Sequence, residues 1–479
     1  MTDDLLAVRR AKLERLRADG IDPFPHAYPG VTPIADVRDA HADLAPGTDT
    51  ESTYRVAGRL HARRGQGKMA FLDLDDRSGR LQLQAKLDVL GAERMERLLE
   101  LDLGDLVGID GTVFMSRRGE LSLRVDDVTV LAKSLRPPPE KHHGLTDVEQ
   151  RFRRRELDLI GNPETRALFV LRAKVITAVR RALDEDGFVE VETPVLQPLY
   201  GGALARPFTT HHNALGRDLY LRIATELYLK RLIVGGLERV YELGKDFRNE
   251  GVSFKHNPEF TMLEWYEAYA DCYDAADRLE TLVASVARAV GHDDPDVSFT
   301  EPWRRTTLAQ AILEESGVDI LVHRDAASLA TAVADRLPTE DRSWPQLVDD
   351  LLSKFVEPKL QQPTFLFDYP VELSPFAKAH RDHEGLTERF EMFAYGMELA
   401  NAFSELNDPD VQRERFEAQA RFSAAGDAEA QPFDEGFLLA LEQGMPPTGG
   451  LGLGIDRLVM AMTGKRSIRE VVLFPAMRD

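Results

Sequence analysis

Two stretches far apart in the sequence carry the residues best suited to bind a nucleotide. Residues 247–264 read FRNEGVSFKHNPEFTMLE, and residues 449–457 read GGLGLGIDR. Arg248 offers the planar fork that binds a phosphate through two hydrogen bonds, and Phe260 offers a ring that can stack on a purine. Glycines allow close backbone approach to a flat ligand, and Arg457 is expected in the first turn of a helix, where anions are favoured. Because neither GxGxxG nor GxxxxGK[ST] occurs, the pattern indicates a nucleotide site without a P-loop.

A hairpin is expected to position the first stretch. With residues 241–250 as one strand, Glu242, Gly244, Asp246, Arg248 and Glu250 share a face. On the return strand, a second shared face is expected for Phe260, Met262, Glu264 and Tyr266. If the two faces coincide, one cavity is lined by Arg248, Glu250, Phe260, Glu264 and Tyr266. An ordinary hairpin with surface ion pairs remains the alternative for this segment alone.

A second hairpin is expected over residues 389–406, with a two-residue turn at Tyr395–Gly396. In that register Phe393 faces Glu398, and Glu391 faces Ala400. The two glutamates then lie diagonally, about 7–8 Å apart at Cα. Two such carboxylates repel each other unless a cation joins them, and Mg²⁺ is the natural ion because it prefers oxygen and is usually shared with phosphates.

The same hairpin contains a conflict of phase. Asn401, Phe403 and Glu405 share a face with one another but are out of phase with Glu398. If all four line one site, a β-bulge must lie near Ala400.

The chain is long enough for two domains. Residues 54–131 show five short alternating strands, with a helix between the third and the fourth, which suits an OB barrel that binds single-stranded nucleic acid or serves another purpose. Residues 1–136 are therefore expected to form a first domain, 137–150 a proline-rich linker, and 151–479 a second domain. In the second, a helix is expected to begin at Asn162–Pro163 and to end at Gly187, followed by a strand ending at Pro194. Residues 275–360 are expected to be a mostly helical insertion.

Composition limits the other possibilities. The 479 residues carry a net charge of −21, which argues against a protein that coats nucleic acid non-specifically. Cys272 is the single cysteine, which excludes a disulfide framework and fits the cytoplasm. No apolar run is long enough to cross a membrane, and no signal peptide is evident. The adjacent pairs His142–His143 and His211–His212 lack the cysteine partners of a zinc site.

A basic stretch near the N-terminus allows two interpretations. Arg9, Arg10, Lys12, Arg15 and Arg17 fall within one expected helix. The helix either docks one face on its neighbour or forms an arm that contacts phosphates.

Taken together, these motifs resemble the bacterial class II lysyl-tRNA synthetases, and the resemblance is weakest over 275–360. TPVLQP (193–198), the 247–264 stretch and GLGLGIDR resemble the three class II motifs. More specific are KHHGLTDVEQRFRRRELDLI (141–160), GGALARPFTTHHNAL (201–215), ELYLKRL (226–232) and ELANAFSELNDP (398–409). These favour the lysine enzymes over the aspartate and asparagine relatives.

The resemblance implies an α+β protein: an N-terminal OB-fold anticodon-binding barrel, followed by an antiparallel catalytic sheet flanked by helices. It implies a cytoplasmic homodimer that uses ATP to activate L-lysine and transfers it to tRNA(Lys), with more than one Mg²⁺ in each site. For ATP, the implied residues are Arg248, Glu250, His256, Asn257, Phe260, Glu391 and Arg457. Arg248 and Arg457 would be the catalytic pair, and Glu391 and Glu398 would hold the metal. For lysine, the implied residues are Gly202, Glu226, Arg248, Glu264, Tyr266, Asn401, Phe403 and Glu405.

In the barrel, Phe71, Gln82 and Asp127 fall where the family contacts the anticodon. Asp127 stands where relatives often have glutamate. Two further departures from the family pattern, ATEL (224–227) and alanines at 400 and 402, remove no side chain that the chemistry needs.

Three other functions remain as alternatives. A lysine-activating paralogue that modifies elongation factor P would lack the barrel. A fusion that makes lysyl-phospholipid would need membrane helices. A synthetase-like binding protein without activity would not need the complete set of arginines and glutamates.

Overall fold

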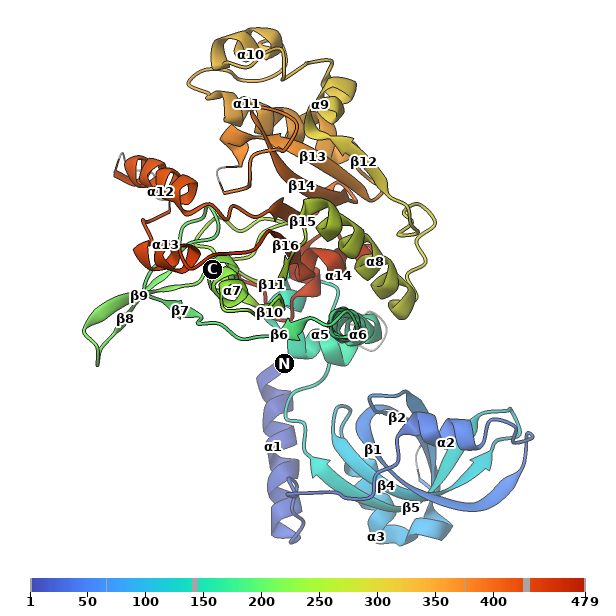
Figure 1. Cartoon of the computed structure of the whole chain (residues 1–479). Coiled ribbons are helices and arrows are strands. Elements are labelled where there is room, and N and C mark those ends of the chain that lie inside the picture. Colours follow the sequence, from blue (N-terminus) through green and yellow to red (C-terminus); the bar gives the residue numbers. More distant parts are fainter. Residues whose placement is uncertain (1, 66, 140–144, 375, 425–430, 478–479) are drawn as a thin grey trace. The chain divides into compact units, whose positions relative to one another are not determined.

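The computed structural model describes residues 2–65, 67–139, 145–374, 376–424 and 431–477, so the His142–His143 pair lies outside the described residues. The chain divides into two compact units, Met1–Pro163 and Glu164–Asp479. Figure 1 labels their helices and strands.

The first unit is built on a closed barrel with strand order β1-β2-β3-β5-β4. A helix between β3 and β4 completes the predicted OB arrangement, so this expectation is confirmed. Alternating burial along β2 and β3 puts Leu72 and Leu83 inside the barrel and leaves Phe71 and Gln82 half-buried on its outer side. The elements of this unit are α1 (Thr2–Ala18), α2 (Ile34–Ala40), β1 (Asp49–Arg64), β2 (Met69–Asp75), β3 (Arg80–Lys86), α3 (Leu87–Glu100), β4 (Leu106–Met115), β5 (Leu121–Ala132), α4 (Val148–Arg153) and α5 (Arg155–Gly161).

Helix α1 docks on the barrel through its basic side chains. Arg9 is buried and donates to the backbone carbonyls of Ser134, at 3.0 Å, and Leu103, at 3.1 Å. Lys12 forms an ion pair of 2.7 Å with Asp102. These contacts favour the docked interpretation of the helix over the phosphate-binding arm.

The second unit is built on one sheet with the order β12-β13-β14-β15-β16-β11-β10-β6. Neighbours from β13 to β10 run antiparallel, as predicted, whereas the edge pairs β12/β13 and β10/β6 are parallel. A smaller sheet has the order β7-β9-β8. The strands are β6 (Val189–Glu190), β7 (Leu196–Gln197), β8 (Thr209–His212), β9 (Arg217–Leu221), β10 (Arg239–Phe247), β11 (Glu259–Ala268), β12 (Arg304–Thr307), β13 (Thr364–Pro370), β14 (Leu386–Ala394), β15 (Met397–Ser404) and β16 (Thr448–Gly454).

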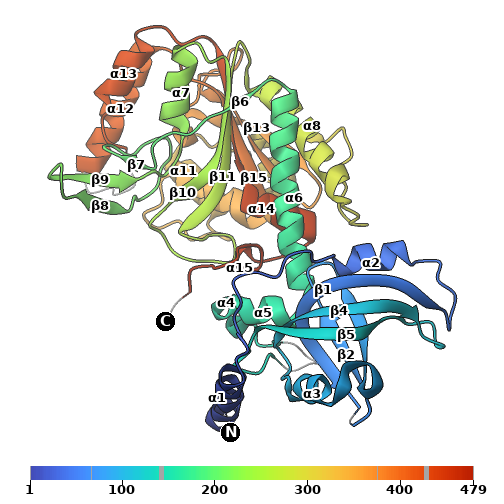
Figure 2. The same ribbon diagram turned by 90° about the horizontal axis from the view of Figure 1, so that it is seen from below.

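Helices cover both faces of the main sheet, as Figure 2 shows. On one face α6, α8 and α14 pack on apolar residues that include Leu263 and Trp265. On the other face α7, α12 and α13 pack around Val240 and Tyr266. The helices of this unit are α6 (Pro163–Glu185), α7 (Glu226–Val234), α8 (Cys272–Val290), α9 (Leu308–Ser316), α10 (Ala326–Val333), α11 (Trp344–Leu351), α12 (Pro409–Ala424), α13 (Glu435–Leu441), α14 (Ile455–Thr463) and α15 (Ile468–Val471), with short turns η1 (Leu352–Val356), η2 (Glu357–Lys359) and η3 (Val371–Leu373).

The segment expected to be a helical insertion has two different environments. Helix α8 belongs to the main core beneath the sheet. Helices α9, α10 and α11 gather around a separate apolar cluster that includes Leu347 and reaches the sheet at Leu366 and Phe393.

Two predicted strands are shorter in the structure. The strand expected to end at Pro194 is limited to Val189–Glu190 and is followed by the separate short strand β7. The strand expected over residues 241–250 stops at Phe247. Arg248 still donates its backbone amide to Pro258, and the chain leaves the hairpin at Asn249, whose backbone amide donates to the carbonyl of Arg206.

The second hairpin has the predicted turn and a bulge. Tyr395 and Gly396 both adopt positive φ, as a tight two-residue hairpin turn requires. Phe393 pairs with Glu398, as expected, but Glu391 pairs with Asn401 and not with Ala400. One extra residue in β15 therefore separates the two pairings, which confirms the β-bulge predicted near Ala400.

Candidate active site

Strand β11 forms one wall of a cavity because its side chains alternate between two environments. Leu263 and Trp265 belong to the apolar core, whereas Glu264 and Tyr266 point to the opposite face and line the cavity. Arg248 follows the end of β10 and stays close to β11, because its backbone amide donates to Pro258 at 2.9 Å.

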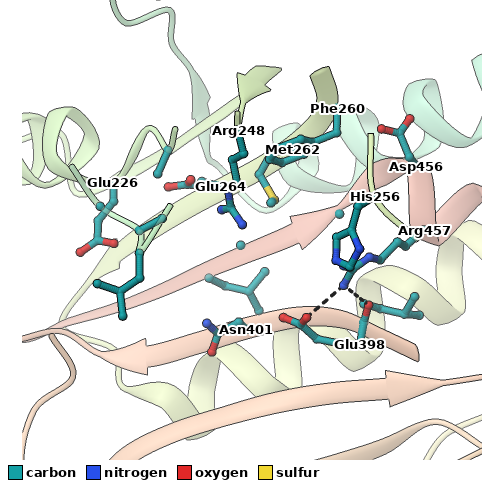
Figure 3. A pocket seen from close by; sticks show the side chains of 18 of the residues that line it. Glu226, Arg248, His256, Phe260, Met262, Glu264, Glu398, Asn401, Asp456 and Arg457 are labelled. Carbon is teal, nitrogen blue, oxygen red and sulfur yellow. Dashed lines mark hydrogen bonds and ion pairs between the residues drawn. The ribbon is translucent and has the colours of Figure 1, made fainter. Parts of the chain in front are cut away.

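The cavity has a volume of about 410 Å³. It collects all but one of the residues predicted for the catalytic domain; the exception is Glu391, which does not line it. Figure 3 shows Arg248 between the carboxylates of Glu226 and Glu264 on one side and His256 with Arg457 on the other. The predicted residues that line it are Gly202, Glu226, Arg248, Glu250, His256, Asn257, Phe260, Glu264, Tyr266, Glu398, Asn401, Phe403, Glu405 and Arg457.

One end of the cavity is rich in cations. The Arg248 guanidinium lies 5.1 Å from the centre of the Phe260 ring. Arg457, in the first turn of α14 as predicted, donates to a carboxylate oxygen of Glu398 at 3.0 Å and lies 3.3 Å from His256 Nε2. Burial and the neighbouring Arg457 lower the pKa of His256, so this imidazole is neutral at physiological pH. The pair of arginines makes this end suited to phosphates.

Asp456 fixes the start of helix α14 and thereby the position of Arg457. Its carboxylate accepts from the backbone amide of Thr261 at 2.8 Å and forms an ion pair of 2.6 Å with Arg172. The helix is thus tied to β11 and to α6.

The other end of the cavity is rich in carboxylates. Glu226, Glu264 and Glu405 are all buried there, together with Tyr266. Burial, with Asp246 and Glu226 nearby, raises the pKa of Glu264 to about 8. Burial also raises the pKa of Glu405 to about 7, although a neighbouring lysine opposes that change. Buried carboxylates of this kind need a cation, and an ammonium group suits them.

Arg389 lies between the cationic and the carboxylate ends of the cavity, and it was not identified as a site residue from the sequence. Its guanidinium donates to Asn401 at 3.0 Å and to Glu391 at 2.6 Å, and it lies 5.5 Å from the centre of the Phe403 ring. The available signal was its position two residues before Glu391 on the same strand, which places both side chains on one face.

Arg222 was missed as well. It is almost fully buried, and it occupies the space over Gly244, where a Cβ would lie 2.3 Å from its Nη2 atom. It forms an ion pair of 3.1 Å with Asp246 and another with Glu242. Glu242 and Asp246 therefore bind this internal arginine and do not line the cavity.

The two glutamates predicted for metal lie close enough to influence each other. Burial and Glu398 raise the pKa of Glu391 to about 7, against the opposing effect of Arg389. Glu391 accepts from the Tyr369 hydroxyl at 2.9 Å. Among the described residues no group of three or more His, Cys, Asp and Glu side chains is arranged to hold a metal. A magnesium ion here would thus need further oxygens, which a nucleotide supplies.

The predicted anticodon residues lie on the barrel. Phe71 and Gln82 come from the paired strands β2 and β3, and Gln82 accepts from the Ser122 hydroxyl at 3.1 Å. Asp127 lies farther along β5, where β5 pairs with β4, and its carboxylate is 3.6 Å from Arg94.

The histidine pair His211–His212 and the single cysteine were the other candidates for chemistry in the sequence. His211 is exposed and lies 2.7 Å from Asp218, and His212 accepts from the backbone amide of Leu215 at 3.2 Å. Burial raises the pKa of Cys272 to about 12, which keeps its thiol protonated.

Comparison with known proteins agrees with this geometry. Residues 147–478 match the family model described as tRNA synthetases class II (D, K and N), and residues 54–131 match the OB-fold nucleic acid binding domain. The lysine–tRNA ligase of Moorella thermoacetica is 51% identical over 99% of this chain and 98% of its own length. That of Chloroflexus aurantiacus is 51% identical over 100% and 99%, and that of Carboxydothermus hydrogenoformans is 48% identical over 99% and 98%. The chain belongs to the class II tRNA synthetases.

Proposed function

We propose that the protein activates L-lysine with ATP and transfers it to the 3′ end of tRNA(Lys). The observation that carries this proposal is the cavity with arginines at one end and buried carboxylates at the other, in a chain whose relatives along its full length are lysine–tRNA ligases. A phosphate-binding end suits ATP, and an end where buried carboxylates outnumber the cations suits an amino acid with an ammonium side chain.

The residue roles follow from these two ends. Arg248 would hold the α-phosphate and the lysine carboxylate, and Arg457 the γ-phosphate. Phe260 would stack on adenine, and Glu250, His256, Asn257 and Glu391 would complete the ATP site. Gly202 and Glu226 would meet the α-amino group, and Asn401 the carboxylate. The side-chain ammonium would be surrounded by Glu264, Tyr266, Phe403 and Glu405.

The reaction needs alignment more than proton transfer. The lysine carboxylate attacks the α-phosphorus of ATP, the bond to the bridging oxygen breaks, and pyrophosphate leaves with the electron pair. Since the carboxylate is already a nucleophile, no general base is required, and catalysis rests on positioning and on neutralising charge. In the second step a ribose hydroxyl of the tRNA takes the lysyl group, and AMP leaves.

Glu391 and Glu398 fit the magnesium that this reaction uses. Both offer carboxylate oxygens, and their mutual repulsion is relieved when a cation lies between them. Bound there, Mg²⁺ would neutralise charge on the phosphates.

Specific transfer to tRNA rests on the barrel. We predict that Phe71→Ala lowers kcat/KM for tRNA charging by roughly 5- to 150-fold, since stacking on one base is worth about 1–3 kcal/mol. Lysine-dependent exchange of pyrophosphate into ATP should stay unchanged, because that step needs no tRNA. The matched control is Phe24→Ala, which removes an exposed ring outside the barrel strands. Equal losses in charging and exchange for Phe71→Ala would contradict the anticodon role.

The raised pKa values of the buried carboxylates predict that lysine binding depends on pH. Because the pKa values of Glu264 and Glu405 are about 8 and about 7, the empty cavity holds protons that the bound ammonium must displace. The complex therefore binds fewer protons than the empty site, and raising the pH favours it. KM for lysine, measured at saturating ATP, is expected to be level above about pH 8, to rise about tenfold between about pH 8 and pH 7, and to rise up to about a hundredfold for each pH unit below about 7. A KM that stays constant from pH 8 to pH 6 would exclude this mechanism.

The proposal includes the oligomeric state and the cellular location of the protein. A homodimer is supported by exposed apolar side chains within the segment that resembles motif 1, Val195 and Leu196, and beside it, Val189 and Leu199. Among the described residues no helix is long and apolar enough to cross a membrane. We place the enzyme in the cytoplasm, where its tRNA substrate is used.

Transfer of labelled lysine tests the proposal. The label is expected at the 3′ end of tRNA(Lys). Labelling of elongation factor P without labelling of tRNA would favour the paralogue, and no transfer at all would favour a binding protein.

A further inference from the structure

A lysine of the protein itself lies behind the carboxylate end of the cavity. Lys230 is on α7, one helical turn after Glu226, and its side chain is 1% exposed. Its ammonium lies 2.6 Å from Glu226 Oε1 and 2.5 Å from Glu405 Oε2. Among the described residues that line the cavity, Lys230 is absent while both glutamates are present. One internal cation thus holds two of the substrate-facing carboxylates.

Each glutamate keeps a second oxygen on the cavity side. A Cβ placed at Gly202 would lie 3.6 Å from Glu226 Oε2, and a Cβ placed at Gly450 would lie 1.9 Å from Glu405 Oε1. Both glycines line the cavity. Both oxygens of Glu405 are fully buried without a hydrogen-bond partner among the described residues, but Oε2 lies beside the Lys230 ammonium and Oε1 lies toward Gly450. Lys230 therefore binds the rear oxygens and leaves the front oxygens for a ligand.

The charges at this end can be counted. Glu226, Glu264 and Glu405 carry three negative charges when ionised, and Lys230 supplies one positive charge, which leaves two uncompensated. An amino acid with an ammonium side chain brings two cations to this end, whereas a neutral amino acid brings one. Tyr266 and Asp246 are further titratable groups close to the cluster. Burial raises the pKa of Tyr266, so it stays neutral, and Asp246 forms an ion pair with Arg222.

We infer that Lys230 is a positioning residue for amino-acid specificity: it orients Glu226 and Glu405 and sets the uncompensated charge at this end of the pocket to match the two ammonium groups of a basic amino acid. This inference rests on the proposed lysine activation. Burial disfavours the charged form of Lys230, but the two glutamates outweigh that effect and hold its pKa above the usual value. The ammonium is therefore permanent at physiological pH.

The variant Lys230→Met keeps the length of the side chain and removes its charge. Glu226 and Glu405 then repel each other, and the empty site takes up an additional proton that lysine must displace. KM for lysine in pyrophosphate exchange is expected to rise about 10²-fold, whereas KM for ATP should not change. Proton release on lysine binding should rise by about one, measured by calorimetry at one pH in two buffers with different ionisation enthalpies.

Lys133→Met is the matched control. Lys133 is another buried lysine held by two carboxylates, Asp102 at 2.5 Å and Asp105 at 2.8 Å, but it belongs to the first unit. This control should leave KM for lysine and the proton count at wild-type values. Two results would show that Lys230 is only a structural residue and that the inference is wrong. One is an equal rise in KM for lysine and for ATP in Lys230→Met, and the other is an unchanged number of protons released when lysine binds.

A second variant tests the same count of charges without leaving Glu226 and Glu405 to repel each other. Lys230→Met combined with Glu226→Gln again leaves two negative charges, so its proton release should equal the wild-type value while KM for lysine stays high. An additional proton released by this double variant would overturn the inference. Failure of the wild-type protein to bind lysine would instead overturn the proposed function, which keeps the two outcomes distinct.

Discussion

Replacing Arg248 with alanine is expected to lower lysine-dependent pyrophosphate exchange by about 10³-fold or more. Loss of one group that stabilises developing charge typically costs 10²–10³-fold, and Arg248 serves both the phosphate and the attacking carboxylate in the proposed mechanism. Its guanidinium lies between the two ends of the cavity and over the Phe260 ring, at 5.1 Å, so its loss also releases the ring that we propose stacks on adenine.

The fold should survive this substitution. The side chain of Arg248 donates a long hydrogen bond of 3.5 Å to the carbonyl of Ile223, and little structure depends on it. The matched control is Arg288→Ala, an exposed arginine on α8 that should leave exchange unchanged. Near-normal exchange by Arg248→Ala, with an unaltered circular dichroism spectrum, would refute its role at the α-phosphate.

Replacing Gly450 with alanine is expected to raise KM for lysine by about 10²-fold or more. The added methyl group would lie 1.9 Å from Glu405 Oε1 and 2.5 Å from Tyr266 Cε1. Neither side chain can retreat, because Glu405 is held by Lys230 and Tyr266 is buried. The methyl group must therefore displace the groups proposed to surround the substrate ammonium, and a displacement near 1 Å typically costs about 10²-fold.

Gly452→Ala provides the comparison on the same strand and the same face. Its nearest contacts would be Met262 Sδ at 3.8 Å and Glu264 Cγ at 3.9 Å, which are ordinary van der Waals distances. KM for lysine is expected to change much less in this variant than in Gly450→Ala. Equal effects of the two substitutions on lysine KM would show that Glu405 and Tyr266 do not shape the pocket as described.

The two-residue alternation of side chains along the strands predicts most of the residues that line the cavity. The alternation of β11 placed Glu264 and Tyr266 together, and the phase conflict in the second hairpin predicted the bulge that brings Glu398 and Asn401 to the same cavity. A bulge is visible in a sequence only when residues on both sides of it are known to share a site. That knowledge came from the resemblance to the family, since the spacing alone also suits an ordinary hairpin.

The charged residues that hold the site in place were harder to predict from the sequence. Arg222, Lys230 and Arg389 each make at least one contact with a residue 12–175 positions away, and only the fold reveals such contacts. A buried arginine or lysine looks the same in a sequence as an exposed one. The strand ends were also uncertain, because the chain leaves β10 through a hydrogen bond to Arg206, which lies outside the hairpin.

The most direct test of the central claim is pyrophosphate exchange into ATP, measured with lysine, aspartate and asparagine in separate reactions. A pocket with two uncompensated negative charges predicts exchange with lysine and only background with the other two, because discrimination based on buried, unpaired groups can reach about 10⁴-fold. Exchange with aspartate and none with lysine would contradict the assignment of Glu226, Glu264 and Glu405 to a cationic substrate, and with it the proposed function.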